Sequence, residues 1–412
     1  KSTQTMTKKW WQFWKAEQKS NALGVLIRQS STFTSYNFAS FVQEAYQQNT
    51  TVYACIQEYV KAWASCPIII KRGEDVIQND SIIKLLSNPN FYQSQDEFFE
   101  NVVIYYLVGG EAPVYGDAVI PTRLPKELQV LRPDWLVPTL STTQVGAVAE
   151  WRYTASDIQA QSMSISPANL MMFKAFNPLC RYRGLSPLNP AAFAIDQLNE
   201  YNRTNYSLLK NGMQPSGSLT TEGNIDEDKF ERLKEQFSDT YTGSGNNGKP
   251  IILEGGLTWQ PFGFNLRDAE FLGGKNSSKK DICEVLGVPT QLIGIDGSQT
   301  YANYEQARAA FYEDRAIPLL NMFLSGLNRW LGLRAGLRPD DVICVDNDGV
   351  LALEPRRTDR NKMLDTLQSI TVNEKRTAMG YEPKDGGDEL LVNSGLVPIE
   401  MAGADIPMGS IM

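Results

Sequence analysis

The sequence predicts an α+β fold in which helices and strands occupy separate stretches of the chain. Segments with apolar residues at helical spacing flank a Pro- and Thr-rich stretch, Glu111 to Phe176, whose pattern is typical of short strands and turns. A smaller strand–helix–strand pattern, Met213 to Phe264, is inserted between two of the helices. The 412 residues, 42% of them apolar, are enough for more than one packed unit.

The first elements follow from periodicity and capping. A helix is predicted over Thr51–Ala64, and the segment PIIIKRGEDVI predicts a hairpin with its turn at Arg72–Asp75. The next helix begins at Ser94, which stands at capping-box spacing from Glu97, and Gly109 closes it. The stripes expected to face the core are Val52, Ile56, Tyr59 and Trp63 in the first helix and Phe98, Val102 and Tyr105 in the second.

Two further helices bracket the small insert. Ser186 suits the N-cap, and Pro187 the first position, of a helix that ends at Gly212. The other helix is predicted over Asp268–Gly287. Its pair Gly273–Gly274 indicates a bend or close helix packing, because each glycine weakens a helix by roughly 1 kcal/mol. The inward residues are expected to be Phe193, Leu198, Tyr201 and Leu208 in the first helix and Phe230, Leu233 and Phe237 within the insert.

A small polar loop, GIDGSQT, leads into the longest helix. This helix is predicted over Asn303–Arg334, with a kink at Pro318. After the strand-like segment DVICVDNDGVLAL, one or two short helices are expected around RRTDRNKMLDTLQSI and VNEKRTAM. The stripe of the long helix is Phe311, Ile317, Leu320, Phe323, Leu327, Trp330 and Leu331.

Composition narrows the classes of function. The chain has no histidine, which removes the commonest general base and metal ligand and lowers the expectation of catalysis. The net charge of −8 argues against tight clamping of nucleic acid but not against nucleic acid that slides past. No run of about eighteen apolar residues predicts a membrane span. The five cysteines contain no CxxC pair and are typical of reduced thiols in the cytosol.

Three motifs that suggest chemistry have simpler explanations. Gly243–Lys249, GSGNNGK, fits a phosphate-binding loop, but Pro250 replaces the metal-binding Ser or Thr and the predicted helix precedes the loop, so a turn is favoured. The carboxylates of IDEDKFE suit the start of a helix. Asp346 and Asp348 lack the downstream Glu of a calcium loop, which favours a turn.

Two basic segments have alternative explanations. KKWWQFWK could anchor at a membrane surface, but its short length favours docking on a partner subunit. GGKNSSKK usually indicates a solvated helix face, and the alternative is contact with the phosphates of passing nucleic acid. The aromatic residues of the first segment are Trp10, Trp11, Phe13 and Trp14. The lysines of the second are Lys275, Lys279 and Lys280.

Several segments occur in a distinctive order along the chain: VYACIQEYVKAWASCPIIIKR, LLSNPNFYQSQDEFFENVVIYYLVGGEA, YRGLSPLNPAAFAI, and GGKNSSKKDICEVLGVPTQLIG followed by TYANYEQARAAFYEDRAIPLL. In this order they resemble the portal (head-to-tail connector) proteins of tailed bacteriophages, in the compact branch of about four hundred residues. The likeness covers roughly Val52 to Leu331. The Gly273–Gly274 pair departs from the helical residues usual there.

The resemblance implies a portal-like fold with a β-rich wing, paired stem helices around a small α/β clip, a long kinked helix and a helical crown. The implied parts are an N-terminal arm (1–50), the wing (51–186), stem helix 1 (187–212), the clip (213–265), stem helix 2 (266–288), a tunnel loop (289–303), the long helix and a strand (304–353), and the crown and tail (354–412).

The resemblance also implies a function. Portals form a ring, typically twelve-fold, at one capsid vertex, which conducts double-stranded DNA during packaging and ejection without reading its sequence. The ring meets the major capsid protein and docks the terminase motor and head–tail adaptors. The residues implied to contact DNA are Asp296, Gly297, Ser298, Gln299, Thr300, Tyr301 and Asn303 in the tunnel loop, with Lys275, Lys279 and Lys280 as candidate phosphate contacts in the stem.

No enzymatic activity, cofactor or membrane contact is expected of such a protein. It would belong to the virion and assemble in the host bacterial cytoplasm. Two alternatives stay open at this point. One is a nucleotide-binding enzyme that uses Gly243–Lys249, and the other is a membrane-peripheral scaffold that uses the Trp-rich segment.

Overall fold

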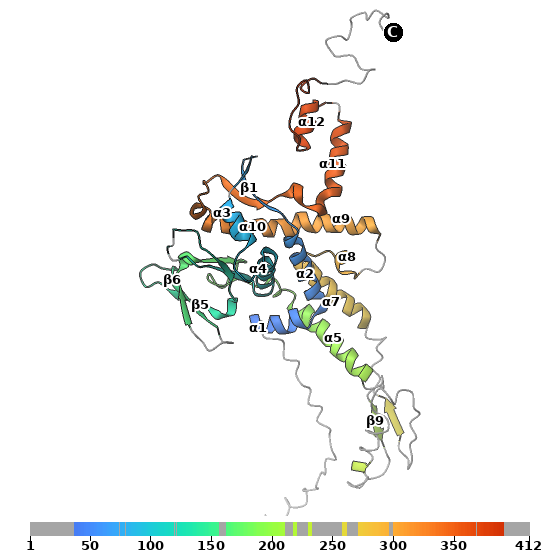
Figure 1. Ribbon diagram of the computed structural model, residues 1–412. Coiled ribbons are helices and arrows are strands. Elements are labelled where there is room, and N and C mark those ends of the chain that lie inside the picture. Colours follow the sequence, from blue (N-terminus) through green and yellow to red (C-terminus); the bar gives the residue numbers. More distant parts are fainter. Residues whose placement is uncertain are drawn as a thin grey trace, which may run out of the picture. The chain divides into compact units, whose positions relative to one another are not determined.

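The computed structural model (Figure 1) describes residues 37–390 apart from 74, 79, 119, 121, 156–161, 211–216, 221–229, 233–257, 262–270, 296–299 and 368. Helices and antiparallel sheets alternate in blocks within these residues, which confirms the predicted α+β class. The glycine-rich motif Gly243–Lys249, the Trp-rich segment, and Asp226, Glu227 and Asp228 of IDEDKFE lie outside the described residues.

The core forms where three helices meet around one tryptophan. Trp63 is fully buried, and its ring lies 6.1 Å from the ring of Phe99 and 5.8 Å from that of Phe323. Its indole N–H donates to the carbonyl oxygen of Ala316 at 3.2 Å, so the polar edge of the ring is satisfied inside the core. The three helices are α2 (Thr50–Ala64), α4 (Gln95–Gly109) and α10 (Ile317–Leu331).

The predicted capping box at the start of α4 is confirmed. Ser94 N donates to the Glu97 carboxylate at 2.8 Å, and Glu97 N donates to the Ser94 hydroxyl at 3.3 Å. The residue that closes the helix is Gly110 rather than Gly109. Gly110 has φ 76°, in the left-handed region, and its N–H donates to the carbonyl oxygen of Tyr106 at 2.8 Å.

Four antiparallel sheets occur among the described residues. The predicted hairpin of β1 and β2 is confirmed, and the distant strand β11 extends it, with Ile70 opposite Ile343. Arg72 also donates two hydrogen bonds to the buried Asp341 carboxylate, at 2.7 and 2.9 Å. The sheets are β11 (Asp341–Val345), β1 (Ile68–Arg72) and β2 (Asp75–Ile77); β4 (Leu128–Val130), β3 (Glu111–Gly116) and β8 (Leu170–Lys174); β5 (Leu136–Leu140), β6 (Val148–Thr154) and β7 (Ser162–Ile165); and β9 (Gly217–Thr220) with β10 (Thr258–Pro261).

The helix before the insert, α5 (Ala192–Lys210), starts later than the predicted Pro187. A regular helix from Pro187 would require an N–H on Pro190 to donate to the carbonyl of Ser186, and proline has none. Asn189 N donates to that carbonyl instead, at 3.0 Å, in a tighter turn.

Two aromatic residues predicted to face inward are exposed. Phe193 is 59% exposed and Phe230 is 55% exposed. Leu198 is buried as predicted and Tyr201 is half-buried, whereas the side chains of Leu208, Leu233 and Phe237 lie outside the described set. Apolar residues spaced three and four apart form the buried face of α5, and Phe193 falls on the other side. This buried face is made of Ala192, Ala194, Ile195 and Leu198.

The long helix is interrupted just before Pro318, the residue at which the kink was predicted. A π-helical segment, Tyr312–Ala316, separates α9 (Tyr301–Phe311) from α10. Pro318 stands at the second residue of α10 and cannot donate to the carbonyl four residues earlier, so the widened turn takes up the defect. The predicted stripe of this helix is confirmed, with Trp330 half-buried and the other six residues buried.

Part of the stretch assigned to an N-terminal arm belongs to the folded body. Phe38–Ser40 (α1) and the π-helical Phe41–Gln47 follow a capping box formed by Asn37. Phe41 is 5% exposed and Ala45 is fully buried, and the segment contacts α2, α4 and α5. Burying the phenyl ring favours this docking by about 2–3 kcal/mol.

The remaining helices agree with the prediction for the last part of the chain. Two short helices follow β11, after two single 3-10 turns at Asn347–Gly349 and Leu351–Leu353. These helices are α11 (Glu354–Thr366) and α12 (Val372–Ala378), and α3 (Asp80–Ser87) precedes α4.

Candidate functional site

The helices that precede and follow the insert, α5 and α7 (Phe271–Leu286), pack side by side (Figure 1). A Cβ atom added to Gly274 of α7 would lie 2.4 Å from the hydroxyl oxygen of Tyr201 on α5. One turn along, the buried Ser278 hydroxyl donates to the side-chain oxygen of Gln197 at 3.2 Å. The close packing predicted from the glycine pair is therefore confirmed.

Buried side chains fasten α7 to α2. The Sγ atoms of Cys55 and Cys283 lie 3.7 Å apart, and Tyr59 donates its hydroxyl to the carbonyl oxygen of Leu286 at 2.8 Å. Contact with Cys283, reinforced by burial, raises the pKa of Cys55, and burial raises the pKa of Tyr59. Both groups are neutral at physiological pH, so they hold helices together and offer no nucleophile.

The three predicted lysines lie on α7, away from this buried contact. Lys275 and Lys279 are half-buried and one turn apart on the same face, and Lys280 is exposed. The structure thus brings together two of the three candidate phosphate contacts.

The loop that follows α7 is anchored at its first end. The short helix α8 (Thr290–Ile293) ends at Gly294, which has φ 73°. Ile295 N then donates to the carbonyl oxygen of Thr290 at 3.2 Å. Leu292, Ile293 and Ile295 pack against the main core. The loop therefore leaves from a fixed point on the body.

The second end of the loop is fixed by a helix cap. The Thr300 hydroxyl accepts from Asn303 N at 3.4 Å, so α9 begins at Tyr301 and not near Asn303 as predicted. Tyr301 and Asn303 consequently belong to the first turn of the helix, and Tyr301 is 77% exposed. Four of the predicted DNA-contacting residues, Asp296, Gly297, Ser298 and Gln299, lie outside the described residues.

The far end of α9 is set rigidly into the core. The ring of Phe311 lies 4.9 Å from that of Tyr59, edge to face, and Phe311 is 2% exposed. At the exposed end, a hydrogen bond to Glu305 raises the pKa of Tyr301, so its phenol is a neutral donor and acceptor at physiological pH. The described residues of this arrangement present polar groups on a stiff support.

A close contact between backbones positions the approach to α5. A Cβ on Gly184 would lie 2.0 Å from the carbonyl oxygen of Gly110. Gly184 N donates to the buried Glu111 carboxylate at 2.7 Å, and Arg183 pairs with the same carboxylate at 2.7 Å. Burial raises the pKa of Glu111 despite this pairing. Ser186 donates its hydroxyl to the carbonyl oxygen of Val108 at 2.7 Å, which ties the segment GLSPL to the end of α4.

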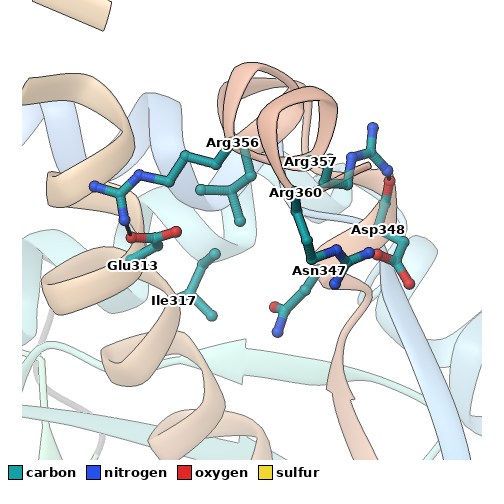
Figure 2. A pocket seen from close by; sticks show the side chains of 8 residues that line it. Glu313, Ile317, Asn347, Asp348, Arg356, Arg357 and Arg360 are labelled. Atoms are coloured by element: carbon teal, nitrogen blue, oxygen red, sulfur yellow. Dashed lines mark hydrogen bonds and ion pairs between the residues drawn. The ribbon is translucent and has the colours of Figure 1, made fainter. Parts of the chain in front are cut away.

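A cavity of about 310 Å³ lies at the start of α11 (Figure 2). Three arginines of α11 lie around it, and Arg356 and Arg357 each have an acidic partner, Glu313 and Glu354 respectively. Sequence reasoning missed this site. The available signal was the run RRTDR, which periodicity alone placed on a helix. The lining residues are Glu313, Ile317, Asn347, Asp348, Leu353, Arg356, Arg357 and Arg360.

The remaining motif forms a turn. The Asp346 carboxylate accepts from Asp348 N at 3.2 Å and caps a single 3-10 turn, which agrees with the preferred interpretation. No group of three metal-binding side chains occurs in the described part of the chain. Within the same part, no helix has the length and apolar character needed to span a bilayer.

Comparisons with known proteins agree with this arrangement. A sequence profile for the family described as phage portal protein matches residues 50–380. An uncharacterised protein of Rickettsia felis is 32% identical over 361 residues, which cover 84% of this chain and 90% of that protein. A chain from the neck of an empty gene transfer agent particle, determined with C6 symmetry, is 29% identical with a TM-score of 0.67, and the match covers 86% of this chain and 96% of that chain. A chain from the neck of the native particle, determined with C12 symmetry, is 29% identical with a TM-score of 0.64, over 84% and 94% of the two chains.

Proposed function

This chain belongs to the phage portal protein family and has the role of a capsid portal in a virion, and we propose that it fulfils this role as a ring of twelve copies whose channel conducts double-stranded DNA. The observation that carries the proposal is the family match over residues 50–380. The twelve-fold number is supported by the C12 symmetry of a similar neck chain.

The loop between Gly294 and Thr300 contacts the DNA in this proposal. Its two ends are held by α8 and by the cap of α9, and α9 is itself anchored in the core at Phe311. A short segment between rigid supports can yield to a moving duplex and return. Apart from Asp296, the residues of this loop are uncharged, and such groups suit that task because they form weak, sequence-independent contacts with phosphates.

The charge of the chain suits conduction rather than tight binding. Each copy carries a net charge of −8, so a ring of such chains repels the phosphate backbone over most of its surface. Lys275 and Lys279, adjacent on α7, would supply local attraction that keeps the duplex near the axis. Contacts of this kind steady DNA without holding it in one register.

The remaining parts of the proposal follow the portal division of the chain. Helices α5 and α7 form the stem, and the insert that joins them is the clip that docks the terminase motor and later the head–tail adaptors. The sheets of β3 to β8 belong to the wing, beside the major capsid protein, and α11 and α12 belong to the crown. The ring assembles in the host bacterial cytoplasm.

The family is structural, and both alternative functions depend on segments outside the described part of the chain. Hydrolysis of ATP belongs, in this proposal, to the separate motor. The enzyme alternative uses Gly243–Lys249 and predicts ATP binding that is lost in Lys249→Ala. The membrane alternative predicts flotation with liposomes that is lost when the first twenty or so residues are removed.

Shortening the loop by deleting Gly297–Gln299, which keeps Thr300 as the cap of α9, tests the channel proposal. Rings should still assemble, because α8 and α9 hold their own contacts with the core, while DNA packaging or retention falls. A deletion of similar length in the turn between β5 and β6, at Thr142–Val145, is the matched control and should leave packaging unchanged. Normal packaging and retention by the loop variant, with intact rings, would contradict the assignment of the loop.

A further inference from the structure

Three arginines converge at the base of α11 from its first two turns. Arg356 and Arg360 are spaced four residues apart and therefore lie on one face of the helix. Figure 2 shows Arg356 extending toward Glu313 on one side of the cavity and Arg360 extending toward Asn347 on the other, with Ile317 between them. The cavity thus has guanidinium groups on two sides and an apolar floor.

The carboxylates of Glu313, Asp348 and Glu354 equal the three arginines in number, but in the described part of the chain only Glu313 and Glu354 form ion pairs with them. Arg356 pairs with Glu313, and Arg357 pairs with Glu354 and donates to the carbonyl oxygen of Asp348. In the described part of the chain, no hydrogen bond or ion pair engages Arg360. A second donor is also unused, since the Nε of Arg357 is buried and lacks a partner among the described atoms.

The apolar side of the cavity strengthens the electrostatic attraction between a nearby guanidinium and an anion. Ile317 is 6% exposed and Leu353 is 7% exposed, so one side of the cavity is dry protein. A guanidinium beside such a surface is less screened than one in open water and attracts an anion more strongly. The carboxamide of Asn347 adds a neutral donor at the rim.

We propose that this cavity, the arginine pocket, binds a phosphate group through Arg360 and Arg356. A tetrahedral oxyanion matches the forked geometry of a guanidinium and accepts two parallel hydrogen bonds from it. The volume of about 310 Å³ exceeds that of a single ion and leaves room for the groups attached to a phosphodiester. The phosphate could come from the backbone of double-stranded DNA or from free inorganic phosphate. Binding of the DNA backbone rests on the proposed function.

The test uses the full chain with Arg360→Gln and a matched control, Lys362→Gln. Lys362 lies on the same helix and its substitution removes the same charge, but its side chain is 72% exposed, pairs with Asp359 and does not line the pocket. Binding of inorganic phosphate is followed by broadening of its phosphorus NMR line. Binding of a fluorescent DNA duplex is followed by anisotropy at several salt concentrations, with light scattering to record the assembled mass.

We expect Arg360→Gln, but not Lys362→Gln, to abolish the line broadening. If DNA is the source, the slope of log affinity against log salt also becomes shallower by about one for each phosphate that the variant no longer neutralises. An unchanged slope together with abolished broadening supports the pocket with free phosphate as its ligand. Broadening that survives in Arg360→Gln would overturn the proposal.

A change of assembled mass in Arg360→Gln alone would also overturn it, because the pocket would then receive a neighbouring copy. Arg360→Lys keeps the positive charge but lacks the two parallel donors of a guanidinium, so it should show part of the line broadening of the wild type. Because assembly is measured separately, failure of the pocket is distinguishable from failure of the ring.

Discussion

The contact between Gly110 and the segment before α5 gives the sharpest prediction about the architecture. Gly110 has φ 76°, and an added Cβ would lie 2.3 Å from the carbonyl carbon of Leu185 and 2.6 Å from the nitrogen of Ser186. These are backbone atoms, so no side-chain rotation relieves the overlap. Gly110→Ala must move the whole segment away from α4.

The magnitude follows from three contributions. An alanine in the left-handed region costs about 1–2 kcal/mol. Forcing the two backbones apart adds about 1–3 kcal/mol, and loss of the hydrogen bond from Ser186 to Val108 adds about 1 kcal/mol. The expected destabilisation is therefore roughly 3–6 kcal/mol, a large fraction of the stability of a typical protein.

Gly73 supplies a matched control for backbone conformation. It has φ 62° in the turn between β1 and β2, and nothing lies within 4 Å of an added Cβ. Gly73→Ala should thus cost only the conformational part, about 1–2 kcal/mol. Urea unfolding followed by tryptophan fluorescence should place the midpoint of Gly110→Ala about 1 M below that of Gly73→Ala, for a slope of about 3 kcal/mol per M. Equal midpoints would refute the reasoning about the close contact.

Two further predictions concern titrating groups. Hydrogen bonds from the side chain of Arg72, and then from the backbone of Arg338, hold the pKa of Asp341 below its usual range. The ionised carboxylate therefore stabilises the fold at pH values above the pKa of the unfolded chain. This contribution is lost as the pH falls. Asp341→Asn should therefore lower the urea midpoint at pH 7, with the difference shrinking below about pH 4, and a difference independent of pH would contradict the pairing. Burial raises the pKa of the Cys66 thiol to about 12, so the unfolded chain loses this proton first and stability falls as the pH rises. Between pH 8 and 10 the wild type should lose roughly 1–2 kcal/mol more than Cys66→Ala, and parallel curves for the two proteins would show that the thiol does not contribute.

Local signals predicted most of the helices well. The α4 capping box lies within four residues of sequence, and the buried stripes of α2 and α10 follow from spacing alone. The pair Gly273–Gly274 indicated either a bend or close helix packing, and the close approach of Gly274 to Tyr201 shows the second. Features set by neighbouring residues are therefore readable without a structure.

Features that depend on distant residues were missed or misplaced. The pairing of β1 with β11 joins strands from opposite ends of the body, and no local pattern identifies such a partner. The π-helical segment containing Phe41 was assigned to the N-terminal arm, because its burial depends on the distant helices α4 and α5. The start of α5 was misplaced because Ser186 and Pro187 suit a helix start, while Pro190 cannot donate within the first turn.

The candidate site likewise combines features set by neighbouring residues with features set by distant ones. The helix after the polar loop was expected from its apolar spacing, but its first residue is set by the cap at Thr300. The arginine pocket combines α11 with Glu313 and Asn347, which lie on other elements. Charged residues on a helix predict a face exposed to solvent. Only the fold shows that this face lies beside the buried side chains of Ile317 and Leu353.

The central claim is that this chain forms a ring with a channel. Negative-stain electron microscopy of the purified full chain, with the mass measured by light scattering, tests it most directly. The account predicts rings with an axial hole and a mass near twelve copies, as the C12 symmetry of a similar neck chain suggests. A uniform monomer or dimer at high protein concentration, with no rings in the images, would contradict it.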